Sequence, residues 1–176
     1  WSRYKPERGK DKRGVTGSDI KKLKEISNKI NSIPEEINVH KTISKILENR
    51  KNTVVNGTGI DWSTAEALAF GSLLEEGYPV RLVGQDSGRG TFSQRHSVLR
   101  NQSDNSRYVP LNNISKKQKQ FEVVDSFLSE LAVLGFEYGY SLVEPNTLTL
   151  WEAQFGDFAN GAQVVIDQFI ASGERK

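Results

Sequence analysis

The sequence predicts an α/β domain whose mostly parallel sheet is flanked by helices, preceded by a basic helical arm. Three short segments rich in β-forming residues, 79–84, 121–124 and 147–151, predict strands. A helical pattern lies between the second and the third, and strands joined by crossover helices form parallel sheets buried on both faces. The distribution of charge separates the arm from the domain. Residues 1–60 hold 14 Lys and Arg against 7 Asp and Glu, whereas residues 61–176 hold 10 Lys and Arg against 15 Asp and Glu.

The arm begins with residues 1–17, which are charged and almost free of aliphatic residues, as expected of an extended linker. Apolar periodicity then predicts one amphipathic helix from Ser18 to a break at 33–35, and a second from Asn38 or His40 to about residue 51. Two basic amphipathic helices could bind nucleic acid or an acidic partner. The alternative is a helical hairpin that packs on the rest of a larger enzyme. We favour it because no aromatic residues are interleaved with the basic ones.

The most regular helix is predicted at 62–76. Asp61 or Ser63 can cap its start, and Gly77 can end it in a left-handed conformation. A loop is expected before it, at 55–59. The first strand of the parallel sheet follows the helix at 79–84, as a short buried strand.

The loop Gly84–His96 follows the first strand, at the edge where open α/β sheets bind ligands. It carries Arg89, Arg95 and His96. Two guanidinium groups would suit a dicarboxylate substrate, because guanidinium binds carboxylate through two hydrogen bonds. One alternative is a phosphate cradle formed by its glycines, although neither the P-loop nor the dinucleotide spacing is present. Another is a solvated loop with ordinary surface ion pairs.

The segment 126–170 predicts a helix, a strand and a second helix. Ser126 or Ser129 can cap the first helix, and Asp157 or Asn160 can open the second. The apolar face expected for the first helix consists of Leu131, Leu134, Phe136, Tyr138 and Leu142. The apolar residues of the second are Ala162, Val165, Ile166, Phe169 and Ile170.

An acid and an aromatic surface are expected on the same edge of this sheet. Glu130 lies at a predicted helix start just after a strand, and Phe155 and Phe158 follow the last strand. A carboxyl group beside a flat apolar surface suits a planar, nitrogen-bearing heterocycle. The alternatives are a helix-end acid favoured by the helix dipole and core aromatic residues at a strand end.

Cysteine is absent, and the two histidines, His40 and His96, are far apart. This composition excludes a disulfide framework, a thiolate metal site and a histidine-rich metal site. No signal peptide or long apolar run is present, which predicts an intracellular protein without membrane contact. The start at Trp1 agrees with an internal fragment.

Four motifs together resemble one enzyme family: Gly84–His96, Leu128–Glu130, Gly135–Tyr140 and Leu150–Gln163. They resemble the decarboxylating first component of the 2-oxoglutarate dehydrogenase complex, a thiamine diphosphate-dependent, transketolase-like enzyme. The resemblance covers nearly all of the chain and is strongest over 62–176. Because the family enzyme is several times longer, the resemblance implies an internal fragment that offers half an active site.

The resemblance implies that residues 61–176 form a thiamine pyrimidine-binding domain, incomplete at its C-terminal end, and that residues 1–60 are a linker and helical arm. The implied activity of the full enzyme is oxidative decarboxylation of 2-oxoglutarate in the citric acid cycle. The succinyl group passes to a lipoyl carrier of the dihydrolipoyl succinyltransferase component. The resemblance further implies a homodimer, in bacterial cytoplasm or mitochondrial matrix, with no turnover by the fragment alone. The alternatives are a paralogous thiamine-dependent enzyme for an acid such as 2-oxoadipate, or a non-enzymatic basic binding module.

Roles in binding the cofactor are implied for three residues. Glu130 matches the glutamate that hydrogen-bonds a pyrimidine nitrogen of thiamine diphosphate and so promotes its activation. Phe155 is expected to stack on the pyrimidine ring, with Phe158 behind it. The diphosphate is held through Mg²⁺ by a separate domain in this family, so the magnesium ligands are expected outside this chain.

Substrate contacts are implied for Arg89, Arg95, His96 and Asn113, and His96 is also expected to be catalytic. The sequence departs from the family pattern at two places. Some relatives carry a further histidine at the position of Gln94, and relatives often carry a histidine near Asn113. Gln94 is therefore given no acid-base role, and the contact near Asn113 is open.

Overall fold

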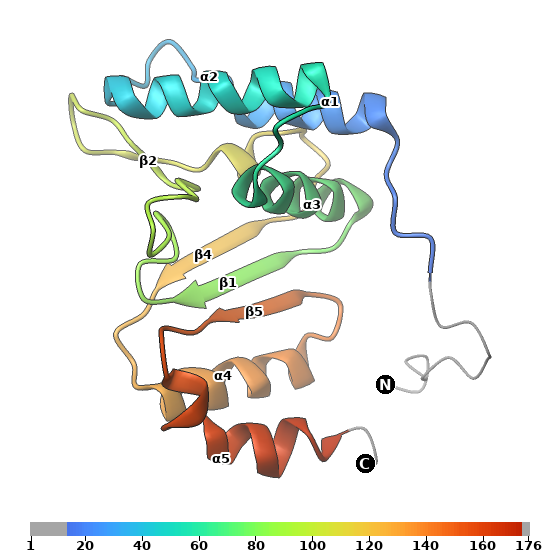
Figure 1. The fold of residues 1–176 in the computed structure, drawn as a ribbon, viewed down its shortest axis with the longest axis vertical. Helices are drawn as coiled ribbons and strands as arrows, with labels where there is room; N and C mark the ends of the chain where they lie inside the picture. Colours follow the sequence, from blue (N-terminus) through green and yellow to red (C-terminus); the bar gives the residue numbers. More distant parts are fainter. Residues whose placement is uncertain (1–13, 174–176) are drawn as a thin grey trace.

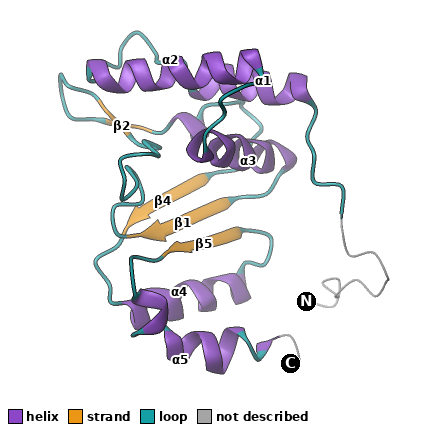
Figure 2. Cartoon of the chain, in the orientation of Figure 1, coloured by secondary structure: helices purple, strands orange, loops and turns teal. Residues whose placement is uncertain are grey.

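The computed structural model describes residues 14–173, which form three layers (Figure 1). A parallel sheet is the middle layer, with α1, α2 and α3 on one side and α4 and α5 on the other (Figure 1). Helices therefore cover both faces of the sheet (Figure 2). Residues 1–13 of the expected linker lie outside the described residues. The elements are α1 (Ile20–Ile30), α2 (Lys41–Asn56), α3 (Trp62–Glu76), β1 (Val80–Gly84), β2 (Leu99–Arg100), β3 (Arg107–Tyr108), η1 (Pro110–Asn112), β4 (Phe121–Asp125), α4 (Glu130–Val143), β5 (Leu148–Glu152), η2 (Asp157–Ala159), α5 (Gln163–Val165) and η3 (Ile166–Ile170).

The sheet has the strand order β4-β1-β5, and all its pairs are parallel. Val80, the first residue of β1, lies opposite Phe121 of β4 and Leu148 of β5. Every residue of β1 is buried, as expected of a central strand covered on both faces. The predicted α/β class with a parallel sheet is confirmed.

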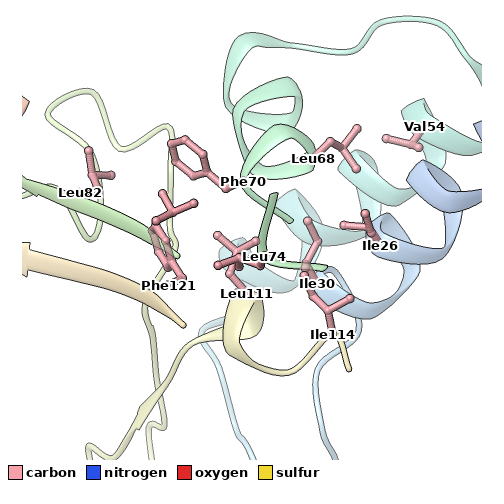
Figure 3. Close-up of a cluster of buried hydrophobic side chains, with 11 residues drawn as sticks. Ile26, Ile30, Val54, Leu68, Phe70, Leu74, Leu82, Leu111, Ile114 and Phe121 are labelled. Carbon is pink, nitrogen blue, oxygen red and sulfur yellow. The ribbon is translucent and has the colours of Figure 1, made fainter. Parts of the chain in front are cut away.

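The main hydrophobic core lies between the sheet and helices α1 to α3. Phe70 of α3 stacks on Phe121 of β4, with the ring centroids 5.7 Å apart, and Leu74 is fully buried in the same cluster. Ile26 and Val54 of the arm belong to this cluster as well (Figure 3). The helical arm and the sheet therefore share one core.

The helix α3 has the bounds that its capping signals predict. The Oδ1 atom of Asp61 accepts a hydrogen bond from the backbone N–H of Thr64 at 2.7 Å. Gly77 ends the helix at φ 95°, a conformation that favours glycine. Phe70 and Leu74 thereby face the sheet from a helix fixed at both ends.

The two helices of the arm differ from their predicted bounds. Helix α1 ends just before Asn31, whose side-chain amide donates to a backbone carbonyl of the helix, so it does not extend to the predicted break. Helix α2 includes Val55 and Asn56, which the sequence assigned to a loop. Burial of Val54 keeps this last turn in place, and the helix ends at Gly57, with φ 72°.

The buried face of α4 is not the predicted one. Leu134 is buried as expected, together with Val133 and Glu137. Three residues expected on the buried face are largely exposed, at 51%, 57% and 44%: Leu131, Phe136 and Leu142. The physical reason is that α4 carries apolar residues around most of its circumference, while Arg81 of β1 binds Glu137 and so turns another face toward the sheet.

The segment after β5 forms three short helical pieces rather than one regular helix. Ala162 and Val165 are buried and pack with Leu134 in a second, smaller core. Phe169 and Ile170, which were expected to be apolar contacts, are 52% and 44% exposed. The last turns therefore present apolar side chains to solvent.

Candidate functional site

The carboxyl ends of the three parallel strands meet at one edge of the sheet. Gly84, the last residue of β1, lies opposite Asp125 of β4 and Glu152 of β5. We call this edge the rim and define it by these three residues. Ligands of open α/β sheets bind beyond such an edge, because the loops that leave it are free to vary around a fixed frame.

Glu130 lies at the rim as the first residue of α4, a helix capped by the hydroxyl of Ser129. Its side chain is partly buried and lines a small hollow together with Trp151. Among the described residues, no group forms a hydrogen bond or ion pair with its carboxylate. A Cβ atom at Gly161 would lie 3.1 Å from Glu130 Oε2, so the glycine leaves room beside the acid.

Phe155 and Phe158 stand on the surface next to the rim and are 84% and 55% exposed. Phe92 of the preceding loop meets Phe155 edge-on, with the ring centroids 6.0 Å apart. Gln154 Nε2 donates to Thr91 Oγ1 at 2.8 Å and joins the two segments. Because these rings are exposed, the alternative that they are core residues is wrong, and they offer an apolar surface to a ligand.

Arg89 is exposed and forms an ion pair with Asp86 and a hydrogen bond with the hydroxyl of Ser93. Both partners belong to the loop between β1 and β2, and both have positive φ, 59° and 53°. Asp125 of the rim accepts a hydrogen bond from the backbone N–H of Gly88 at 2.8 Å. The loop is thus tied to the rim at its start, and Arg89 remains accessible.

Arg95 is held inside the structure, with its side chain 9% exposed. Its Nε lies 2.6 Å from Glu66 Oε1 of α3, its Nη2 pairs with Glu152, and its Nη1 donates to the carbonyl of Ser87 at 2.9 Å. Burial alone would lower the pKa of Arg95, but the hydrogen bonds and charges of the two glutamates raise it above its ordinary value. Arg95 therefore joins the loop to α3 and β5.

His96 ends this loop, is half-buried, and has φ 49°. Burial lowers the pKa of His96, and the positive charges of Arg50 and Arg89 lower it further, against the opposing effects of the Ser93 backbone and Asp86. A lowered pKa favours the neutral imidazole at pH 7, and this is the form that can accept a proton.

Asn113 is not brought to the rim. It is exposed at the end of η1, where its side-chain amide donates to the carbonyl of Val109 at 2.9 Å. The neighbouring Asn112 exchanges two hydrogen bonds with the backbone of Phe121, the first residue of β4. Asn113 therefore lies near the opposite end of the sheet from Glu130.

Sequence reasoning missed three residues that hold the loop: Arg50, Glu66 and Glu152. Glu152 ends a strand at the rim, which was a usable signal. Glu66 lies within an ordinary amphipathic helix, and Arg50 belongs to a basic helix with many charged neighbours. Neither carried a local signal, because their partners are far away in the sequence.

Within residues 14–173, no group of three or more histidine, aspartate or glutamate side chains could hold a metal ion. None of the helices in the same range has the length and apolar character needed to cross a membrane.

A partly buried acid, an exposed aromatic surface and a histidine-bearing loop thus gather at the edge of a parallel sheet. Residues 58–176 match the family described as transketolase, pyrimidine binding domain. The match covers more than half of the chain, and the chain belongs to this family. The transketolase-like resemblance expected from the motifs is confirmed.

The chain is similar to proteins named 2-oxoglutarate dehydrogenase E1 component from Brucella canis, Brucella suis and Brucella abortus. It is 61% identical to each of them over 165 residues. The aligned part covers 94% of this chain and 16% of each relative. The chain therefore spans about one sixth of the length of the curated relatives it matches.

Proposed function

We propose that this chain is the pyrimidine-binding part of a thiamine diphosphate-dependent 2-oxoglutarate dehydrogenase. This oxidoreductase decarboxylates 2-oxoglutarate and passes the succinyl group to a lipoyl carrier. The 61% identity to proteins of that name supports the assignment. Because the chain covers 16% of such a relative, the activity is proposed for the whole enzyme. We expect no turnover by the chain alone.

The observation that carries the proposal is the carboxylate of Glu130. It is partly buried at the rim, and no hydrogen bond or ion pair to it is formed within residues 14–173. Removing a carboxylate from water without a partner costs free energy. A hydrogen bond from a bound ligand would offset this cost, so the site is suited to a ligand that brings a donor to Glu130.

The proposed cofactor is thiamine diphosphate, which supplies the electron sink that decarboxylation of a 2-oxo acid needs. Glu130 would hydrogen-bond a nitrogen of the pyrimidine ring and hold a proton there. Phe155 would stack on the ring, with Phe158 behind it. The absence of a side chain at Gly161 leaves Glu130 free of a contact that a Cβ atom would make at 3.1 Å.

For the substrate, we propose contacts from Arg89 and His96. Arg89 is exposed, and it could exchange its ion pair with Asp86 for a carboxylate of 2-oxoglutarate. His96 offers a neutral ring for proton transfer. Arg95 and Asn113 stay predictions: the first is paired with internal carboxylates, and the second lies away from the rim.

We also propose that a second copy covers the exposed apolar face of α4. Leu131 and Leu142 are exposed on this helix, in line with Gly135 and Gly139. Nothing lies within 4 Å of the place where a Cβ atom would stand at either glycine, so another helix could approach closely. An exposed patch of this kind marks an interface. In the whole enzyme, Leu131→Asp should shift sedimentation from dimer toward monomer.

The remaining parts of the site are proposed to come from the rest of the enzyme. Mg²⁺ and the diphosphate would be held by a domain outside this chain, as the family resemblance implies. The dihydrolipoyl succinyltransferase component would be the partner that accepts the succinyl group. The similarity to Brucella proteins supports the bacterial cytoplasm over the mitochondrial matrix as the location.

The test is Glu130→Gln in the full-length enzyme that carries this sequence, with saturating thiamine diphosphate and Mg²⁺. Decarboxylation of 2-oxoglutarate should fall by about 10²-fold or more, because a general acid-base group contributes that much. Glu75→Gln, at an exposed position on α3, is the matched control and should retain activity. Normal turnover by the Glu130 variant would reject the proposed site. Faster turnover of 2-oxoadipate than of 2-oxoglutarate would reject the substrate but not the class.

A further inference from the structure

Arg50 of α2 reaches from the helical arm into the loop between β1 and β2. It is 6% exposed. Its Nη1 donates to the carbonyl of Arg95 at 2.9 Å, and its Nη2 donates to the carbonyl of Gln94. Nη2 also lies 3.1 Å from Ser63 Oγ of α3. One guanidinium therefore holds two successive carbonyls of the loop.

These two carbonyls directly precede His96. The backbone of His96 is left-handed, with φ 49°, a conformation that is uncommon outside glycine, although histidine and asparagine adopt it more readily than most residues, and that surrounding contacts stabilise. The neighbouring peptide groups are held on one side by Arg50. On the other, the backbone N–H groups of Arg95 and His96 both donate to the carbonyl of Arg89. The direction of the imidazole thus depends on contacts made by Arg50.

The alternative is that Arg50 only joins α2 to α3. Within residues 14–173, Arg50 forms no ion pair, and burial lowers its pKa despite the charges of Asp61 and Glu66. An apolar side chain could join two helices without the cost of burying a cation. The planar guanidinium of arginine can donate to two carbonyl oxygens at once. Binding of the two loop carbonyls therefore explains an arginine at this position better than helix packing does.

We propose that Arg50 is a positioning residue for His96, so that the helical arm is part of the catalytic frame. Arg50 lies outside residues 58–176, which match the family domain. Figure 1 shows the chain leaving the end of β1 and rising toward α2 before it reaches β2. The inference rests on the proposed function for its link to catalysis, while the contact itself rests on geometry alone.

The test compares three variants of the full-length enzyme. Arg50→Lys keeps the charge but loses the two-armed donor. Ser63→Ala removes the contact of Arg50 with α3, together with the long hydrogen bond of 3.3 Å from Ser63 Oγ to Asp61, and leaves both loop carbonyls bound. Arg107→Lys repeats the first change at an exposed position. For Arg50→Lys, kcat for 2-oxoglutarate should fall at least tenfold with less than a threefold change in KM, and trypsin should cleave faster after Arg89. The other two variants should keep their kcat and their resistance to trypsin.

Unchanged kcat and unchanged tryptic cleavage in Arg50→Lys would overturn the proposal. A loss of kcat shared equally by Ser63→Ala would overturn it too, because the role would then be helix packing. If Arg50→Lys does not fold, Arg50→Gln gives the second measurement, and failure of both to fold would assign Arg50 to stability. If the unmodified enzyme decarboxylates no 2-oxo acid, the proposed function fails. Tryptic cleavage after Arg89 then still tests the contact.

Discussion

The guanidinium of Arg81 and the carboxylate of Glu137 form an ion pair with two hydrogen bonds between β1 and α4. The Nε–Oε2 and Nη2–Oε1 distances are 2.7 and 2.8 Å, and the side chains are 11% and 4% exposed. Arg81 also pairs with Glu122 at 2.7 Å and lies over the ring of Tyr140. The hydrogen bonds that Arg81 donates to Glu137 raise the pKa of Arg81 above its ordinary value, against the opposing effect of burial, so its guanidinium stays charged.

Replacing Glu137 should destabilise the chain strongly. Glu137→Ala leaves Arg81 buried with one exposed partner, and the free energy of unfolding should fall by about 3 kcal/mol. Urea unfolding of the 176-residue chain, followed by tryptophan fluorescence, measures this loss. Glu122→Ala is the control: the side chain of Glu122 is 45% exposed, so solvent screening should keep the loss below about 1 kcal/mol. An equal fall in the free energy of unfolding in both variants would contradict the prediction that Glu137 stabilises the fold more than Glu122 does.

The shared core predicts that the arm and the sheet unfold together. Ile26 of α1 is fully buried in the main core, whereas Ile20 of the same helix is 57% exposed. Ile26→Ala should lower the free energy of unfolding by about 3 kcal/mol. Ile20→Ala should change it by less than about 0.5 kcal/mol. Circular dichroism and tryptophan fluorescence should report one midpoint, and two separate midpoints would show that the arm is an independent unit.

The half-buried His96 predicts a loss of stability in acid. Its pKa is lowered in the folded chain, so the unfolded chain binds the proton more tightly. The stability is therefore complete above the ordinary pKa of about 6.5 and is lost as pH falls through the lower, folded value. Burial, Arg50 and Arg89 lower this pKa, and the backbone of Ser93 and the charge of Asp86 oppose them.

His96→Asn should reduce the difference in urea midpoint between pH 7.5 and 5.5. Asparagine accepts the left-handed backbone at this position, which avoids added strain. His40→Asn, the same replacement at an exposed helix cap, controls for the loss of a histidine elsewhere. An undiminished difference in the His96 variant would contradict the prediction.

Gly161→Ala should disturb Glu130 without unfolding the chain. The new Cβ atom would lie 3.1 Å from Glu130 Oε2, so the acid would have to move by a few tenths of an ångström. In the full-length enzyme, the rate at limiting thiamine diphosphate should fall about tenfold, because small displacements of catalytic groups are costly. Gly17→Ala, where nothing lies within 4 Å, should have no effect. A normal rate in the Gly161 variant would place the cofactor away from Glu130.

Local signals account for what the sequence could predict. Asp61 and Gly77 fixed both ends of α3, and the β-forming run at 147–151 became β5 almost residue for residue. The strand and the capping serine that precede Glu130 likewise placed it at a helix start on the edge where ligands bind. Each of these features depends on residues within one or two turns of chain, where spacing carries most of the information.

What the sequence could not show are contacts between distant residues. Arg81 and Glu137 are partners that no periodic pattern connects, and their pairing decides which face of α4 is buried. Arg95 was expected to meet a substrate because guanidinium binds carboxylate and because the family resemblance implied it. Its partners in the structure, Glu66 and Glu152, come from two other elements. The identity of a charged residue does not reveal whether its counter-charge is a ligand or another part of the chain.

The central position of β1 has a consequence for how the chain is made. Both of its neighbours are synthesised later, since β4 begins at Phe121 and β5 ends at Glu152. Until then Val80 and Leu82, which end up almost wholly buried, have no strand beside them. Pairing across such long separations is slow and exposes apolar surface meanwhile. During translation, β1 therefore stays unpaired for longer than β4 or β5, although it is the most buried strand of the finished fold. Of the three strands, β1 should depend most on protection by a chaperone.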